Sequence, residues 1–189
     1  MMNGRRAASL VLLATGIMAM PAADAQNATL RELAKEDQDS RTGKKVNRTD
    51  EERRLLVLAL IAQGAVVAPE DKFDAALVLQ HTELKFCGKD LVSTSPENYL
   101  LAHYFFESAY ESGYKDARYL VAASLDRYLS FTKGYQKYGT NRVFNHETGK
   151  EEWVPIDRKT TDSERAEYGV PPLAVLLKQF PEQSPQKSQ

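Results

Sequence analysis

Hydrophobic residues recur along most of this chain at intervals of three and four positions, which is the spacing of one face of an α-helix. Proline, glycine and capping residues interrupt the pattern and so mark where helices begin and end. The pattern predicts five helices. They span about 28–40, about 49–64, a stretch from Pro69 whose apolar stripe continues to Leu84, about 96–113 and about 115–132.

Local capping signals support these boundaries. Thr49 and Glu52 form a capping box, in which each side chain accepts a hydrogen bond from a backbone N–H at the start of the helix. Pro69 suits a first helical position, where its missing N–H is not needed. Gly64 can end the second helix in the left-handed conformation. The helix ends are therefore readable from the sequence.

The last third of the chain has a different pattern. Two apolar runs flank a glycine-containing turn, which predicts a β-hairpin at about 141–156. Thr161 and Glu164 form a second capping box, and Pro171 precedes a short C-terminal helix. Residues 181–189 are rich in Gln, Ser, Pro and Lys, and this composition predicts a disordered tail.

These elements predict a mainly α protein with one domain over residues 26–180. We expect about five helices in antiparallel hairpins, together with the short β-hairpin and the C-terminal helix. Segments 73–79 and 114–120 share an Asp-Ala pair, and the alanine spacing of 101–109 resembles the Sel1-like branch of the tetratricopeptide repeats. A small helical bundle is the alternative. Either arrangement is expected to turn one face of the fourth helix to the core: Leu101, Phe105 and Ala109.

The first 25 residues differ from the rest of the chain. Two arginines precede an apolar stretch at 7–20, and Ala-Asp-Ala follows at 23–25. These are the features of a secretory signal peptide. The apolar stretch is too short for a membrane span, which takes about 20 residues. The sequence therefore predicts a leader at 1–25, a mature chain from Gln26, a periplasmic or secreted location, and no membrane span after cleavage.

Charge and cysteine content narrow the function classes. The 189 residues include 25 basic and 26 acidic side chains, and the net charge of −1 gives no basic footprint for nucleic acid. Cys87 is the only cysteine, so an internal disulfide is excluded, and we expect its side chain to be buried or half-buried.

His103 and Glu107 are one helical turn apart, which is a spacing that can bind a metal ion. Because the sequence offers no third ligand, we expect both side chains at the surface instead.

Polar side chains interrupt the apolar stripes of three predicted helices. Burying an unpaired charge costs several kcal/mol, so we expect these groups to pair with one another. The interrupting residues are Asp37 and Arg41 on the first helix, Gln80 and His81 on the third, and Arg127 on the fifth, with Asp126 beside it.

Two interpretations of these residues remain open. One is a structural ion-pair network that holds the helices in register. The other is a pocket in which Asp37, His81 and Asp126 serve as acid or base and Arg127 binds an anionic group. The sequence contains no nucleophile elbow, no phosphate-binding loop and no zinc signature, so we expect no metal and no cofactor.

The segment 134–140 contains two glycines, two tyrosines, a glutamine and a threonine, which together can present amide, phenol and hydroxyl groups from tight turns. We predict that this loop folds back over the fifth helix and joins Asp37, His81 and Arg127 in one site. The candidate ligand-binding residues are Arg41, Gln80, Gln136, Tyr138 and Thr140.

The order and spacing of these motifs resemble a bacterial domain family of unknown function. The resemblance spans roughly residues 30–177. Members continue the Tyr-Gly-Thr block with Gln, whereas this chain has Asn141, which keeps the amide on a shorter side chain. The resemblance implies one polar centre and supplies no activity. It is carried by Glu36-Asp37-Gln38 with Arg41, Gln80-His81, Asp126-Arg127, Gln136–Thr140 and Gly169–Leu173.

Two functions therefore remain open. The first is an exported helical module that binds a peptide, a protein or a small polar ligand. The second is an exported hydrolase-type enzyme, in which His81 with Asp37 or Asp126 acts as acid or base. A deep pocket around His81 would favour the enzyme. An open groove lined by three tyrosines would favour the binding module: Tyr99, Tyr104 and Tyr110.

Overall fold

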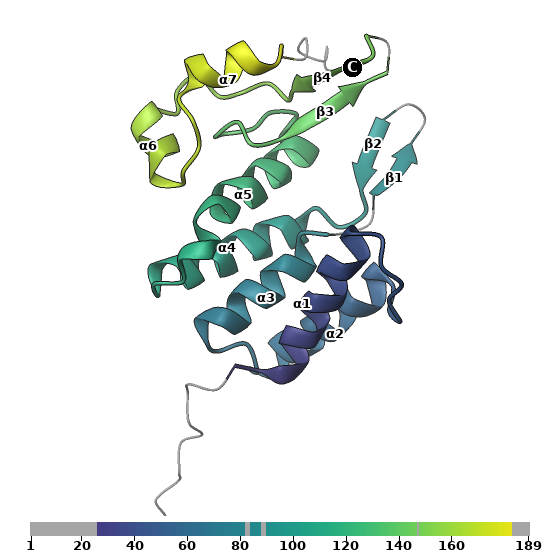
Figure 1. Ribbon diagram of the computed structural model, residues 1–189. Helices are drawn as coiled ribbons and strands as arrows, with labels where there is room; N and C mark the ends of the chain where they lie inside the picture. The colour runs from purple at the N-terminus through teal and green to yellow at the C-terminus, as the bar shows by residue number, and fades with distance from the viewer. Residues whose placement is uncertain (1–25, 82–83, 88–89, 147, 183–189) are drawn as a thin grey trace, which may run out of the picture.

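The computed structural model describes residues 26–81, 84–87, 90–146 and 148–182, and within these ranges the protein is mainly helical (Figure 1). This confirms the predicted fold class. The predicted leader at 1–25 and most of the predicted tail, 183–189, lie outside the described residues. The helices are α1 (Ala28–Arg41), α2 (Asp50–Ala62), α3 (Pro69–Leu79), α4 (Glu97–Glu111), the 3-10 turn η1 (Lys115–Ala117), α5 (Arg118–Lys133), α6 (Asp162–Glu167) and α7 (Leu173–Gln179).

Two antiparallel hairpins interrupt the helices. The first pairs β1 (Leu84–Cys87) with β2 (Asp90–Ser93), and the second pairs β3 (Arg142–Asn145) with β4 (Lys150–Trp153). The second hairpin is the predicted one. None of the helices in the described ranges combines the length and the apolar character needed to cross a membrane.

The helix ends follow the capping signals in the sequence. The Thr49 hydroxyl accepts a hydrogen bond from the Glu52 N–H at 3.2 Å, and the Glu52 carboxylate accepts one from the Thr49 N–H at 2.8 Å. Thr161 and Glu164 repeat this arrangement at the start of α6. Gly134 ends α5 with a φ of +71°, a left-handed conformation that most other residues rarely adopt. Both predicted capping boxes are therefore confirmed.

The first five helices form a stack in which α3 packs against α1, α2 and α4, and α4 packs against α3 and α5 (Figure 1). Their shared core combines large aliphatic and aromatic side chains with alanines that let α3 and α4 approach closely. Its buried members include Leu30, Leu33, Val57, Ala75, Ala76, Leu79, Ala102, Phe106, Ala109 and Val121.

A second core lies on the other side of α5, where Ala122 packs with residues from the loop after α5, from β4, from the segment after α6 and from α7. The Trp153 indole N–H donates to the Leu176 carbonyl at 2.8 Å, which ties β4 to α7. Pro181 and Glu182, which we expected to begin the disordered tail, instead lie against this layer. The Pro181 carbonyl accepts the Trp153 N–H at 2.8 Å, and the Glu182 carboxylate accepts the Ile156 N–H at 2.8 Å.

The predicted extent of the third helix is wrong. The helix ends at Leu79, and Leu84 begins β1 with its side chain exposed. Leu84–Cys87 and Asp90–Ser93 are two runs of four residues separated by two residues, a spacing that is typical of a β-hairpin. The chain forms this hairpin although the spacing of Leu84 from the apolar residues of α3 would also suit a longer helix. Cys87, which we expected to be buried or half-buried, is exposed, because it ends the first strand of this two-stranded hairpin.

The predicted face of α4 is confirmed at Ala109, which is fully buried, but elsewhere the most buried positions lie one residue further along the helix. Phe106 is fully buried, whereas Phe105 is half-buried at the edge of the core. His103 is also buried rather than at the surface, and its Nδ1 lies 2.9 Å from the Val121 carbonyl oxygen. The physical reason is that α3 and α5 flank α4 on two sides, so α4 buries a wider arc than a helix at the edge of a stack.

Candidate functional site

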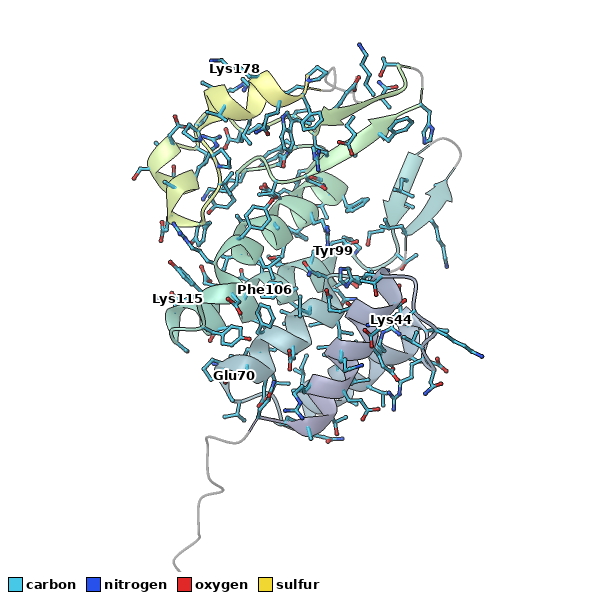
Figure 2. The ribbon with its side chains drawn as sticks, viewed as in Figure 1. Lys44, Glu70, Tyr99, Phe106, Lys115 and Lys178 are labelled. Atoms are coloured by element: carbon cyan, nitrogen blue, oxygen red, sulfur yellow. The ribbon has the colours of Figure 1, made fainter. Side chains whose placement is uncertain are left out.

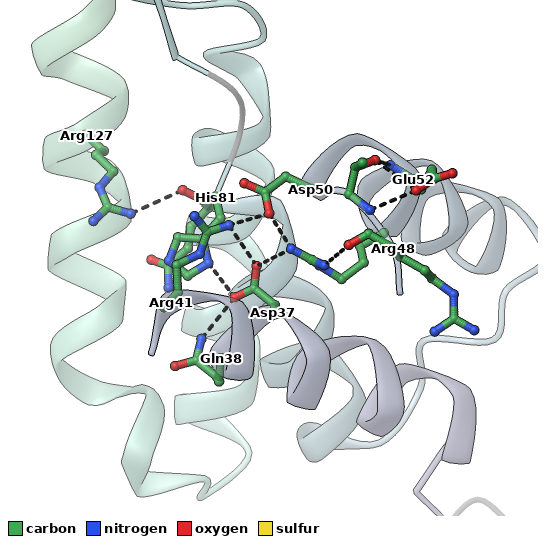
Figure 3. Close-up of polar contacts among 11 residues, drawn as sticks. Asp37, Gln38, Arg41, Arg48, Asp50, Glu52, His81 and Arg127 are labelled. Carbon is green, nitrogen blue, oxygen red and sulfur yellow. Dashed lines mark hydrogen bonds and ion pairs between the residues drawn. The ribbon is translucent and has the colours of Figure 1, made fainter. Parts of the chain in front are cut away.

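The centre of the candidate site is a buried carboxylate paired with a histidine. Asp37 on α1 is 1% exposed, and its Oδ2 lies 2.5 Å from Nδ1 of His81, which follows α3 (Figure 3). The Gln38 amide donates to the same oxygen at 3.0 Å. The His81 ring therefore has its Nδ1 held by the carboxylate, while its Nε2 makes no hydrogen bond to any described residue.

Two arginines and a second carboxylate complete the charge balance around Asp37. Arg41 contacts Oδ1 of Asp37 at 3.4 Å and Asp50 at 2.5 Å. Arg53 is 1% exposed, pairs with Asp50, and lies 4.0 Å from Asp37. Burial opposes the charge on Asp50, but the hydrogen bond and the charge of Arg41, together with the charge of Arg53, lower the pKa of Asp50 overall. These four residues form a paired network between α1 and α2.

Arg127 differs from the other arginines of the centre. It extends from α5, and its guanidinium donates to the Gln80 carbonyl at 3.1 Å, next to His81 (Figure 3). Within the described part of the chain, no carboxylate lies within 4.0 Å of Arg127. Burial lowers the pKa of Arg127, and the nearby charge of Arg41 adds to the effect. A partly buried guanidinium thus stands beside the histidine without a counter-charge among the described residues.

Asp126 belongs to a different arrangement. Its fully buried carboxylate accepts hydrogen bonds from the backbone N–H groups of residues 137–140, at 2.7 to 2.9 Å, and from the Thr140 hydroxyl at 2.8 Å. Burial raises the pKa of Asp126, although these donors oppose the rise. The predicted pairing of Asp126 with an arginine is therefore wrong, because the loop supplies five donors to the carboxylate.

The rest of this loop is also held by structural contacts. The Gln136 side chain is fully buried, donates to the carbonyls of Asn141 and Val154 at 2.8 Å, and accepts the Asn141 N–H at 2.7 Å. Gly139 has a φ of +100°, and a Cβ there would lie 2.6 Å from a Leu176 methyl group. The loop is therefore packed beneath α7.

The structure divides the predicted site residues between two groups. No hydrogen bond or ion pair among the described residues joins them. Asp126 and Arg127 are consecutive on α5 and so point about 100° apart, one toward the C-terminal layer and the other toward the end of α3. The first group is Asp37, Arg41, Gln80, His81 and Arg127; the second is Asp126 with Gln136, Tyr138 and Thr140.

Two residues that pair with the first group, Asp50 and Arg53, were not predicted from the sequence. Asp50 and Arg53 lie in the first turn of α2, and Arg53 shares its buried face with Val57 one turn later. The neighbouring Leu55 and Leu56 are 52% and 42% exposed, so hydrophobicity alone points to the wrong face of α2. Spacing from Val57 is the signal that could have identified Arg53. In the ranges that the structure covers, no three His, Cys, Asp or Glu side chains are placed to hold a metal ion.

Comparisons with models of protein families, with curated proteins and with solved structures found no match to this chain. The fold and the site thus define the protein only as a mainly helical protein with a polar centre at the ends of α1 and α3. The family resemblance carried by the sequence motifs remains a prediction.

Proposed function

We propose that this protein is an exported binding module whose polar centre takes a small ligand with an anionic group. The observation that carries the proposal is the position of the Arg127 guanidinium beside His81. Among the described residues, no carboxylate lies within 4.0 Å of this guanidinium. A guanidinium matches the planar geometry of a carboxylate or phosphate group. The Nε2 of His81, which makes no hydrogen bond to a described residue, offers a further polar contact to the same ligand.

The charge balance of the network supports a ligand in addition to a structural role. Asp37 and Asp50 are two carboxylates that already face two guanidiniums, Arg41 and Arg53. This balanced set is enough to hold α1 and α2 in register. Arg127 and His81 therefore add positive or ionisable groups that the register does not require.

A small ligand fits better than a peptide along the three tyrosines of α4. Tyr99 is 2% exposed and stacks on Phe131 with ring centroids 5.6 Å apart, whereas Tyr104 is 56% exposed. These side chains therefore do not line one groove. The proposed export depends on the predicted leader, and the proposed membership of the bacterial family depends on the motifs; neither assigns an activity.

The binding proposal is tested by measuring melting temperature and heat of binding with inorganic phosphate and with acetate. We expect either anion to raise the melting temperature of the wild-type protein and to have no effect on Arg127→Met. Arg158→Met is the matched control, because it removes an exposed arginine that pairs with Glu182. Equal anion effects in the two variants, or no anion effect in the wild type, would contradict the proposal.

Stability separates binding from a structural role of the same arginine. If Arg127 serves a ligand, Arg127→Met should change the free energy of unfolding by less than about 1 kcal/mol, because no buried carboxylate loses its partner. If Arg127 neutralises the network, the same change should cost about 3–5 kcal/mol. Urea unfolding of the ligand-free protein distinguishes these two results.

The second candidate function is hydrolysis, and the short contact between Asp37 and His81 favours it. A carboxylate that accepts the Nδ1 proton orients an imidazole so that Nε2 can take a proton from water. Arg127 would then hold the anionic group of the substrate. We expect His81→Gln to abolish any hydrolysis of p-nitrophenyl acetate or p-nitrophenyl phosphate, and His146→Gln in the second hairpin to retain it. Unchanged rates in His81→Gln would exclude this mechanism.

A further inference from the structure

The chain immediately before α1 is held by two carboxylates of α3. The Asn27 N–H donates to Oδ1 of Asp71 at 2.6 Å, and the Gln26 side-chain amide donates to Oδ2 of Asp74 at 2.8 Å. The Asn27 side chain also donates to the Ala65 carbonyl at 3.4 Å. Gln26 is thus docked on the fold at the position where the sequence predicts that the mature chain begins.

The carboxylates at this position have little positive charge to balance them. Asp71 and Asp74 are 2% and 9% exposed, and in the described ranges neither has a Lys, Arg or His nitrogen within 4.0 Å. Burial raises the pKa of Asp74, and the charges of Asp71 and Glu70 add to the rise, while Arg31 opposes it. Figure 2 shows Glu70, at the start of α3, at the same end of the helix stack as the start of α1.

Chain geometry places the backbone nitrogen of Gln26 close to these carboxylates. Consecutive backbone nitrogens are at most about 3.7 Å apart. Because the Asn27 nitrogen is 2.6 Å from Oδ1 of Asp71, the Gln26 nitrogen lies within about 6 Å of that oxygen. An opposite charge at about 4–6 Å is close enough to change a pKa.

We propose that Asp71 and Asp74 form a docking site for the α-ammonium group of Gln26 after the leader is removed. A leader-removing endopeptidase adds water across the Ala25–Gln26 bond, which leaves a carboxylate on Ala25 and a free amine on Gln26. The amine takes up a proton and supplies the positive charge that the two aspartates lack. The uncleaved chain has only an uncharged amide nitrogen at this position, so removal of the leader completes the site and stabilises the contact of α1 with α3.

The pH dependence follows from the charges around the amine. The docked ammonium should have a pKa above the ordinary value of about 7.7–8.0 for an α-amino group. Its contribution to stability is then fully present below that ordinary pKa and is lost as the pH rises through the higher folded-state pKa. The charged or titratable groups around it are Glu70, Asp71, Asp74, Arg31 and Tyr114.

The test compares protein that begins at Gln26 with a free amine and the same protein acetylated at Gln26. Acetylation removes the charge and keeps the side chain that bonds to Asp74. We expect a folded-state amine pKa about one unit above the ordinary value by NMR titration. We also expect the free-amine protein to melt at a higher temperature than the acetylated protein at pH 6 and at the same temperature near pH 10.

Asp74→Asn is the informative variant, because Asp71 also accepts the Ala68 N–H at the start of α3 and its loss could unfold that helix. Asp74→Asn should remove much of the rise in the amine pKa, whereas Glu167→Gln, an exposed change on α6, should leave it unchanged. An ordinary amine pKa in the folded protein would overturn the proposal. So would an exported protein whose mass shows cleavage elsewhere, or whose Gln26 has lost ammonia to form an uncharged cyclic terminus.

Discussion

At the scale of single residues, two of the buried carboxylates, Asp37 and Asp126, are satisfied in different ways. Asp126 receives its hydrogen bonds from one local loop, four of them from backbone N–H groups. Asp37 is contacted by side chains from α1, α2 and the end of α3. Asp126 therefore holds the loop in place, whereas Asp37 joins helices and contacts only Nδ1 of His81, whose Nε2 makes no hydrogen bond to a described residue.

Replacing Asp126 by Ala should destabilise the protein by at least about 3 kcal/mol, because it leaves buried backbone N–H groups without an acceptor. Urea unfolding measures the effect. Asp116→Ala in the exposed turn η1 is the control and should change stability by about 0.5 kcal/mol or less. A cost of less than about 1 kcal/mol for Asp126→Ala would show that the loop does not depend on this carboxylate.

At the scale of elements, α4 and α5 each bury more than one face. α4 lies between α3 and α5, and α5 separates the helical core from the C-terminal layer. Helical spacing correctly identified both elements, but on α4 it selected a face one residue away from the most buried one. The difference arises because α4 has a neighbouring helix on each of two sides, so it buries a wide arc of its surface rather than a single stripe.

Phe106→Ala should cost about 3–5 kcal/mol, the usual range for emptying a fully buried aromatic site. Phe105→Ala should cost less than half as much, because the Phe105 side chain is only half-buried at the edge of the same core. Thermal or urea unfolding of the two variants provides a matched comparison. If Phe105→Ala lost more stability than Phe106→Ala, the core-facing side of α4 would be the one predicted from the sequence.

At the scale of the whole molecule, Tyr168 links the C-terminal layer to the helix stack, because it packs against both cores. Its ring centroid lies 6.4 Å from that of Tyr110 on α4 and 5.3 Å from that of Tyr138 in the second core. Burial raises the pKa of the Tyr138 and Tyr168 phenols to about 12, and the Asp126 charge adds to the effect on Tyr138. The attachment of this layer should therefore be sensitive to alkaline pH.

Between about pH 10 and pH 12 the unfolded chain loses these phenol protons while the folded protein keeps them. Stability is thus fully present below pH 10 and should fall as the pH rises further. Urea unfolding at pH 9 and pH 11 measures the loss, which we expect to be smaller in the double variant Tyr138→Phe, Tyr168→Phe. Tyr104→Phe, at an exposed phenol, is the control. An equal loss in the double variant and the wild type would contradict this prediction.

The sequence by itself determined where the capped helices begin and which residues interrupt the apolar faces. Capping acts over three or four residues, so Thr49 with Glu52 was sufficient to locate the start of α2. Asp37 and His81 stood out because a charged or polar side chain on an apolar stripe requires a partner. These are local properties, and the structure retains them.

Only the tertiary structure decided which residues meet. The partners of Asp37 come from sequence positions as distant as His81, and the buried Arg53 was hidden beside exposed leucines. Asp126 and Arg127 are adjacent in the chain, yet they face different layers because one residue rotates a helix by about 100°. Contacts of this kind depend on how the helices stack, and no local pattern specifies that stacking.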